Sequence, residues 1–256
     1  MTTTPSAAFA ARLGELVASA SERPEIVGLV GFGSTADRAR ADEWSDLDIA
    51  VIVEPGHEER LRRELGWLPH PERVALSVVD QWDALMVVTD DGELMEFGVA
   101  NLDTFTSWIA DRAEVILDRA DVASALQKIL ARPAREVDVA TEIRVALVKL
   151  LVGAGRARRG ELLTANRNIR GEALEHLLRA WAAALPGDRA VLDTLDPHRR
   201  FERAHPELAA RAEAALRLDA EGAARGLLDL AEETLGTRDD FPREGAAAIR
   251  RRLSWD

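Results

Sequence analysis

The sequence predicts a mixed α/β (α+β) domain over residues 1–118, followed by an α-helical domain over residues 119–256. Three observations support this division. Residues 26–32 and 47–53 are short apolar runs, rich in β-branched side chains, with the length of buried strands. Residues 84–100 contain two further apolar runs around Asp-Asp-Gly, a turn sequence typical of β-hairpins. In the second half of the chain such runs vanish, and Ala, Leu, Arg and Glu recur at helical spacing.

The composition favours a cytoplasmic protein that does not bind membranes. The 256 residues are 47% apolar, which is ample for a buried core, and no apolar run is long enough to span a bilayer. The absence of cysteine fits a reducing compartment, and we expect no signal peptide because no basic region precedes an apolar stretch near Met1. The net charge of −12 argues against a broad nucleic-acid surface. It favours a cationic small-molecule partner, or none in particular, because overall charge bears first on solubility.

Proline and glycine separate the predicted elements of the first domain. A helix begins the domain, and its apolar residues lie at helical spacing. Pro24 precedes the first strand, and Pro55 with Gly56 ends the second. We expect helices at 6–22 and 57–66, and strands at 26–32, 47–53, 73–79, 85–89 and 93–99.

The second domain carries only helical patterns, punctuated by proline. Residues 118–136 are the predicted linker between the domains. Helices are predicted at 121–131, 138–159, 168–185, 206–217, 220–235 and 243–253.

The residues from Gly33 to Asp48 carry the clearest chemical signal. Gly33 and Ser34 follow the first strand, where a glycine backbone, a hydroxyl and nearby amide groups can approach and bind phosphate oxygens. Asp46 and Asp48 open the next strand, and strand geometry places their side chains on one face. Such paired carboxylates suit Mg²⁺, which commonly takes one or two carboxylates and completes its shell with water and substrate phosphates. A solvated acidic strand edge after a glycine turn would be the alternative reading.

This combination of strand, Gly33-Ser34, polar segment and Asp46-Leu47-Asp48 resembles the signature of the polymerase-beta-like nucleotidyltransferase superfamily. It looks most similar to the branch that acts on small molecules, the aminoglycoside and lincosamide nucleotidyltransferases. The resemblance covers about the first hundred residues, and implies a nucleotidyltransferase domain with a small mixed sheet, followed by a helical bundle. It further implies that Asp46 and Asp48 bind metal, and that Gly33 and Ser34 contact the β- and γ-phosphates of a nucleotide.

Glu96 is the candidate for a third carboxylate. Its neighbours Met95 and Phe97 are apolar, so the residue is a charge within a strand that we expect to be central in the sheet. In the superfamily that this sequence resembles, a later strand carries a third acidic residue between apolar side chains. The resemblance implies that this residue completes a metal site and acts as general base. Asp80 and Glu93 are competing candidates, and a role of Glu96 in keeping a strand edge soluble stays open.

Lys149 is the candidate for a phosphate contact from the second domain. It lies among apolar residues of the predicted helix 138–159, and resembling enzymes supply such a lysine from an early helix of their second domain. A lysine whose stem is buried and whose ammonium group reaches water is an equal alternative. Trp44 and Trp108 could stack on a base or sugar, although such tryptophans more often serve packing.

Together these features predict an Mg²⁺-dependent enzyme with ATP, or another nucleoside triphosphate, as co-substrate. It would transfer a nucleoside monophosphate to a hydroxyl of a small, cationic acceptor such as an aminoglycoside-like antibiotic, and release pyrophosphate. The active site is expected in the cleft between the two domains. Two alternatives stay open: modification of a protein or tRNA, and a non-catalytic, antitoxin-like or regulatory protein on the same fold.

Overall fold

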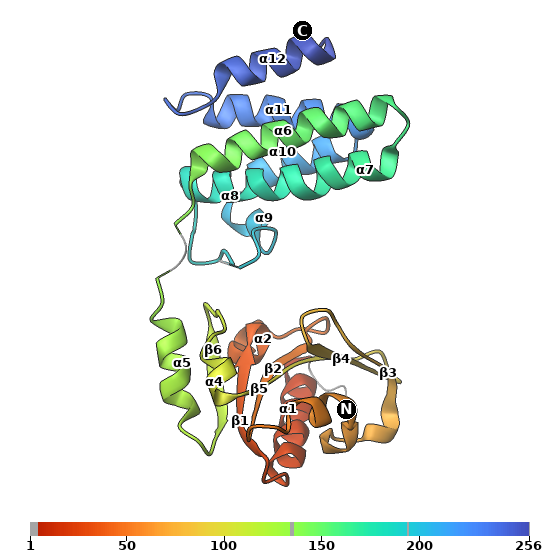
Figure 1. Ribbon diagram of the computed structural model, residues 1–256, viewed down its shortest axis with the longest axis vertical. Coiled ribbons are helices and arrows are strands. Elements are labelled where there is room, and N and C mark those ends of the chain that lie inside the picture. The colour runs from red at the N-terminus through yellow and green to blue at the C-terminus, as the bar shows by residue number, and fades with distance from the viewer. Residues whose placement is uncertain (1–4, 134–135, 194, 256) are drawn as a thin grey trace. The chain divides into compact units, whose positions relative to one another are not determined.

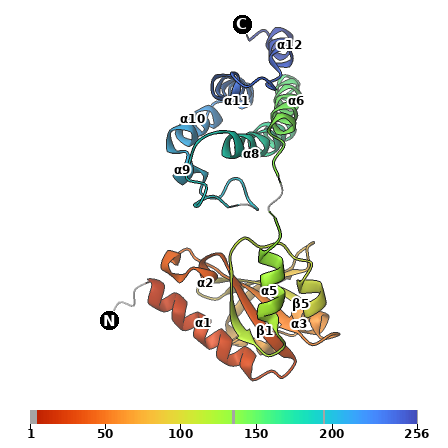
Figure 2. The same ribbon diagram turned by 90° about the vertical axis from the view of Figure 1, so that its left-hand side faces the viewer.

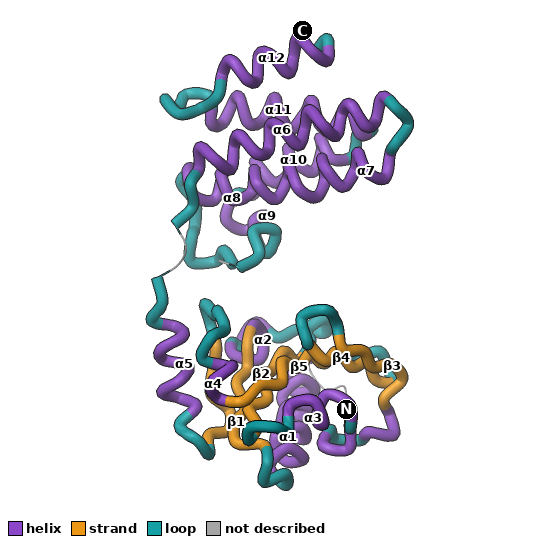
Figure 3. The backbone as a smooth tube through the Cα atoms, in the orientation of Figure 1, coloured by secondary structure: helices purple, strands orange, loops and turns teal. Residues whose placement is uncertain are grey.

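The computed structural model describes residues 5–133, 136–193 and 195–255 (Figure 1). The chain divides into two compact units, Met1–Pro133 and Ala134–Asp256. Within the described residues all strands belong to the first unit, and the second unit is helical (Figure 3). Mixed α/β structure followed by helices therefore occurs as the sequence predicts. Among the described residues, no helix combines the length and apolar character that a membrane span requires.

The first unit is built on a six-stranded mixed sheet with the strand order β3-β4-β5-β2-β1-β6. Strands β2 and β5 are parallel neighbours, and the other neighbouring pairs are antiparallel. The strand that carries Glu96 lies between β4 and β2, so its predicted central position is confirmed. The strands are β1 (Ile26–Phe32), β2 (Leu47–Val53), β3 (Val74–Val79), β4 (Ala84–Thr89), β5 (Leu94–Asn101) and β6 (Ala113–Asp118).

The two faces of the sheet bury different sets of side chains. Alternate residues such as Ile49 and Phe97 pack with α1 (Pro5–Ser21) in one apolar cluster. The residues that follow them, such as Ala50, belong to a second cluster with α4 (Leu102–Phe105) and α5 (Val122–Leu130). Figure 2 shows α1 and α5 on opposite sides of β1. The same alternation places Asp48 and Glu96 on the second face.

The division between the two units falls after Pro133, inside the predicted linker 118–136. Helix α5 buries Val122 and Leu126 against the sheet, so the first unit extends to Pro133. Strand β6, which pairs with the outer side of β1, is absent from the predicted elements. Its Glu114 and Asp118 interrupt the apolar pattern, because an edge strand exposes alternate side chains to water. Of the predicted linker 118–136, residues 134 and 135 lie outside the described residues.

Asp118 fixes the start of α5. Its carboxylate accepts hydrogen bonds from the backbone N–H groups of Ala123 and Val122, both at 2.9 Å, and of Ala120 at 3.2 Å. These bonds, from Ala123 first and then Val122, favour the charged form and lower the pKa of Asp118 below its ordinary value.

Asp118→Ala is expected to destabilise the first unit by about 1 kcal/mol at pH 7, which is typical for loss of a helix-capping side chain. Because the pKa of Asp118 is lower in the folded chain, its contribution is complete above the ordinary carboxyl pKa and is lost as the pH falls through the folded pKa. The free energies of unfolding of the wild type and of Asp118→Ala, measured in urea, should therefore differ less in acid than at pH 7. An equal difference at both pH values would contradict the assignment.

The second unit is a bundle in which α6 (Val139–Arg158) contacts most of the other helices. The core surrounds Trp181, which is fully buried and donates from Nε1 to Thr234 Oγ1 at 2.8 Å. The predicted helix 168–185 differs in detail, because residues Arg167–Ala173 are π-helical and continue from α7. The other helices are α7 (Leu162–Asn166), α8 (Leu174–Ala184), α9 (Phe201–Ala204), α10 (Pro206–Leu216), α11 (Ala220–Leu235) and α12 (Arg243–Leu253).

Candidate active site

Three strands bring the predicted site residues to one edge of the sheet. Strands β1 and β2 are antiparallel, with Gly31 opposite Ile49, so the end of β1 lies beside the start of β2. Strand β5 runs parallel to β2 and begins at the same edge. Gly33 and Ser34 after β1, Asp46 and Asp48 at the start of β2, and Glu96 on β5 therefore share this edge.

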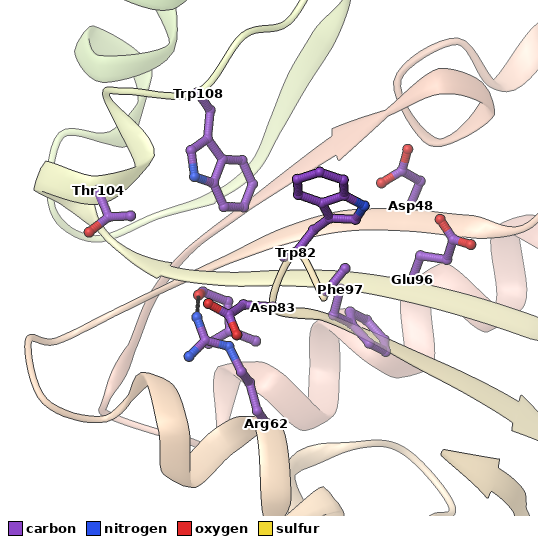
Figure 4. Close-up of a pocket in the computed structure, with 11 residues that line it drawn as sticks. Asp48, Arg62, Trp82, Asp83, Glu96, Phe97, Thr104 and Trp108 are labelled. Carbon is purple, nitrogen blue, oxygen red and sulfur yellow. Dashed lines mark hydrogen bonds between the residues drawn. The ribbon is translucent and has the colours of Figure 1, made fainter. Parts of the chain in front are cut away.

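Asp48 and Glu96 are direct neighbours across the parallel pair β2–β5. Neighbouring strands lie about 4.8 Å apart, and residues in register point to the same face. Figure 4 shows the two carboxylates close together on one side of the sheet. Both residues are half-buried. Two carboxylates held this close favour a cation between them, because the cation offsets their mutual repulsion.

Thr35 connects the turn after β1 to the start of β2. Its fully buried side chain accepts a hydrogen bond from the backbone N–H of Asp48, with 3.2 Å between N and Oγ1. The lack of a side chain at Gly31 makes room for it, since a Cβ there would lie 2.6 Å from Thr35 Cγ2. Thr35 is not among the candidate residues predicted from the sequence, although it directly follows Gly33 and Ser34.

Gly33 has a conformation that L-residues rarely adopt. Its φ is +53°, and the four-residue helix α2 (Gly33–Ala36) begins at this residue. A Cβ at Gly33 would meet no atom within 4 Å, so glycine is required by backbone conformation rather than by crowding. The half-buried Ser34 follows at once.

The competing carboxylates have structural partners elsewhere. Asp80 accepts hydrogen bonds from the backbone N–H groups of Trp82 at 2.8 Å and Ala84 at 2.9 Å, and so closes the turn between β3 and β4. Glu93 forms an ion pair with Arg12 of α1. Neither is the registered neighbour of Asp48, a position that Glu96 occupies.

A pocket of about 300 Å³ lies beside Asp48 and Glu96 (Figure 4). Gly98 forms part of its floor, and the Trp108 indole packs directly on this glycine: a Cβ there would lie 2.2 Å from Trp108 Cη2. Trp108 also meets Phe105 edge-on, with 5.5 Å between ring centroids. The lining residues are Asp48, Arg62, Trp82, Asp83, Ala84, Glu96, Phe97, Gly98, Val99, Thr104 and Trp108.

The donor chemistry at this edge fits Mg²⁺. Asp48 and Glu96 offer hard oxygen atoms from adjacent, registered positions, and Mg²⁺ needs only one or two such ligands besides water and phosphates. Asp46 lies one residue before β2. Within the described part of the chain, no three His, Cys, Asp or Glu side chains are grouped as a ready-made metal site. The predicted ligand set of Asp46, Asp48 and Glu96 thus stays a prediction, with Asp48 and Glu96 as its registered pair.

Lys149 belongs to the helical unit. It lies on α6, about one-third exposed, and forms an ion pair with Glu172 of the π-helical segment. Glu172 also meets Arg167, at 3.1 Å from its Nε. These contacts, Lys149 first, lower the pKa of Glu172. The predicted contact of Lys149 with a triphosphate stays a prediction.

The chain shows only weak similarity to known proteins. No protein-family model and no curated protein sequence matches the chain. Among solved structures, an aminoglycoside 6-adenyltransferase from Bacillus subtilis is similar at a TM-score of 0.32 and 12% identity, covering 100% of this chain and 93% of that one. A STING-associated CdnE c-di-GMP synthase from Capnocytophaga granulosa has a TM-score of 0.30 and 12% identity, covering 94% and 79%. Likeness at this level assigns no activity.

Proposed function

We propose that the protein is an Mg²⁺-dependent nucleotidyltransferase, with ATP as the expected donor and a hydroxyl of a small, cationic molecule as acceptor. The observation that carries this proposal is the registered pair Asp48–Glu96 on parallel strands, at the sheet edge that also bears Gly33 and Ser34. This edge combines carboxylates for a cation with a turn suited to phosphate. An aminoglycoside-like antibiotic is one acceptor of the required kind.

The proposed reaction forms one bond and breaks another at the α-phosphorus. The acceptor oxygen attacks the α-phosphorus, the bond from this phosphorus to the pyrophosphate oxygen breaks, and the hydroxyl proton passes to a Glu96 carboxylate oxygen. Asp46, Asp48 and Glu96 would hold Mg²⁺, which when bound neutralises phosphate charge. The Gly33 N–H and the Ser34 hydroxyl would donate to β- and γ-phosphate oxygens, and so orient the triphosphate.

One residue of the second unit and the net charge of the chain complete the proposal. Lys149 would contribute a positive charge to the triphosphate, in exchange for or in addition to its contact with Glu172. The net charge of −12 favours a cationic acceptor over a polyanionic one such as tRNA.

Calorimetric titration of ATP, CTP, GTP and UTP into the protein tests this proposal directly. We expect one nucleotide to bind selectively with Mg²⁺ and to lose most of its affinity in EDTA, because the carboxylates repel the phosphates unless a cation is present. An aminoglycoside mixture should then stimulate pyrophosphate release if the acceptor is of this kind. Failure of all four nucleotides to bind would refute the proposal. Binding without pyrophosphate release for any hydroxyl acceptor would instead support a non-catalytic nucleotide-binding protein.

A further inference from the structure

The order of strands separates the phosphate-binding and acceptor-binding sides of the proposed site. Along the sheet, β1 with its Gly33-Ser34 turn comes first, then β2 with Asp48, then β5 with Glu96, and then β4. Most residues that line the pocket from the sheet belong to β5 and the start of β4, and the lining reaches Asp48 of β2. A hydroxyl bound there would approach Glu96 from the side opposite the triphosphate. On the proposed function, this pocket therefore belongs to the acceptor.

Two tryptophans distinguish this pocket. Trp108 is held in place by its packing on Gly98, and its backbone O accepts a hydrogen bond from Arg132 Nη1 at 2.7 Å. Trp82 is 79% exposed, on the turn that Asp80 closes. An indole so exposed at a pocket has apolar area available for a ligand. Figure 4 shows the two indoles beside one another, with Asp48 and Glu96 on the Trp82 side.

The charges around the indoles select for a cation. Asp83 lines the pocket together with Asp48 and Glu96, the two carboxylates assigned to Mg²⁺, and Arg62 supplies the guanidinium of this lining. In the chain without Mg²⁺ the three carboxylates outnumber this guanidinium, and with Mg²⁺ bound Asp83 and the indole faces remain to attract a cation. Arg62 is held at the wall of the pocket: its Nη2 donates to O of the lining residue Val99 at 2.6 Å, and its Nη1 lies 3.4 Å from Glu59. The faces of the indoles add further negative potential, which attracts a cation placed over the ring.

We propose that this pocket binds a flat aromatic ring that carries a positive charge, and that Trp82 and Trp108 select cationic acceptors of this class over aminoglycoside-like ones. A planar cation places its whole face on an indole and keeps its charge over the ring. An alicyclic aminocyclitol holds its ammonium groups outside the ring and would contact the carboxylates instead. The proposal rests on the proposed function for its assignment to the acceptor, but not for the binding of the ring itself.

N-methylquinolinium chloride is the probe for this proposal, titrated calorimetrically into the full chain without nucleotide at pH 8. Quinoline, which is uncharged at this pH, and the alicyclic diamine 2-deoxystreptamine are the comparison ligands. We expect the charged aromatic probe to bind on the order of tenfold more tightly than quinoline, as cation–π attraction predicts. Equal affinity for quinoline, tighter binding of 2-deoxystreptamine, or no binding of the probe would each overturn the proposal.

Variants locate the bound probe. Trp82→Ala should weaken binding on the order of tenfold, and Trp82→Phe by no more than about threefold, since the ring is retained. Trp44→Ala is the matched control, because Trp44 is 87% exposed and lies outside the pocket lining. Asp83→Asn removes one charge and keeps a residue that tolerates the left-handed backbone of this position, where φ is +63°. Asp83→Asn should lower the affinity for the charged probe and leave the affinity for quinoline unchanged. An unchanged affinity for the probe in Trp82→Ala would overturn the proposal.

A nucleotide analogue separates the acceptor pocket from a nucleobase pocket. With saturating α,β-methylene-ATP and Mg²⁺, the probe should still bind, and Trp82→Ala should leave the affinity for the analogue unchanged. If probe and analogue exclude each other, and Trp82→Ala lowers the affinity for both, the acceptor assignment is overturned. The two indoles would then bind the nucleobase. Binding of the probe with no binding of any nucleotide would refute the proposed function, while the cation-selective pocket would stand.

Discussion

Asp48→Asn is expected to abolish nucleotidyl transfer while the fold is retained. Mg²⁺ contributes several kcal/mol to such reactions, and about 1.4 kcal/mol corresponds to a factor of ten, so a loss on the order of a thousandfold or more is expected. The substitution keeps the shape of a half-buried side chain and removes one of two neighbouring negative charges. Pyrophosphate release measures the loss.

Thermal unfolding gives a second readout of Asp48→Asn that does not depend on turnover. A ligand that binds only the folded state raises the melting temperature, so Mg²⁺ should stabilise the wild type and have little effect on the variant. In EDTA the two proteins should unfold at similar temperatures. Asp103→Asn, at an exposed aspartate of α4, is the control and should behave as wild type in both assays. Near-normal transfer by Asp48→Asn would remove this residue from the metal assignment.

Glu96→Gln is expected to lower the rate of transfer by about 10²–10⁴, the usual contribution of a general base. The amide cannot accept the hydroxyl proton, so kcat should fall while the Mg²⁺-dependent binding of nucleotide is largely retained. The affinity for nucleotide should fall less than in Asp48→Asn, because Asp46 and Asp48 remain to hold the cation.

Glu93→Gln is the matched control for Glu96→Gln. It changes the same residue type on the approach to the same strand, but at a carboxylate that pairs with Arg12 of α1. A partly exposed ion pair of this kind contributes about 0–1 kcal/mol to stability, and its loss should leave the transfer rate unchanged. A larger loss of activity in Glu93→Gln than in Glu96→Gln would reverse the assignment of the third carboxylate.

The sequence was sufficient to predict the strands of the site. Strands 26–32 and 47–53 have the predicted bounds, because each is a continuous apolar run with clear breaks beside it. The hairpin around Gly92 also occurs as predicted. Glu96 could be singled out because a charge between Met95 and Phe97 is unusual within a strand.

Long-range features were not accessible from the sequence. The registration of Asp48 with Glu96 depends on parallel pairing between strands that are distant in the chain, and no local pattern encodes it. Trp82 lies just before β4, whose hairpin with β5 brings it beside Gly98, whereas the place of Asp48 in the same pocket depends on the pairing of β2 with β5. A helical pattern does not reveal that α5 packs on the sheet, so the sequence could not show that residues of the predicted linker belong to the first unit.

The parallel pairing of β2 and β5 also has a consequence for the order of folding. The antiparallel pairs β3–β4 and β4–β5 join strands that are adjacent in the chain, and such hairpins close short loops. Strands β2 and β5 have α3 (Glu58–Arg63), β3 and β4 between them, so their pairing closes a long loop at a greater entropic cost. Asp48 and Glu96 therefore meet only after this slow step. A partly folded chain that contains only the hairpins would hold all of the carboxylates and none of the site.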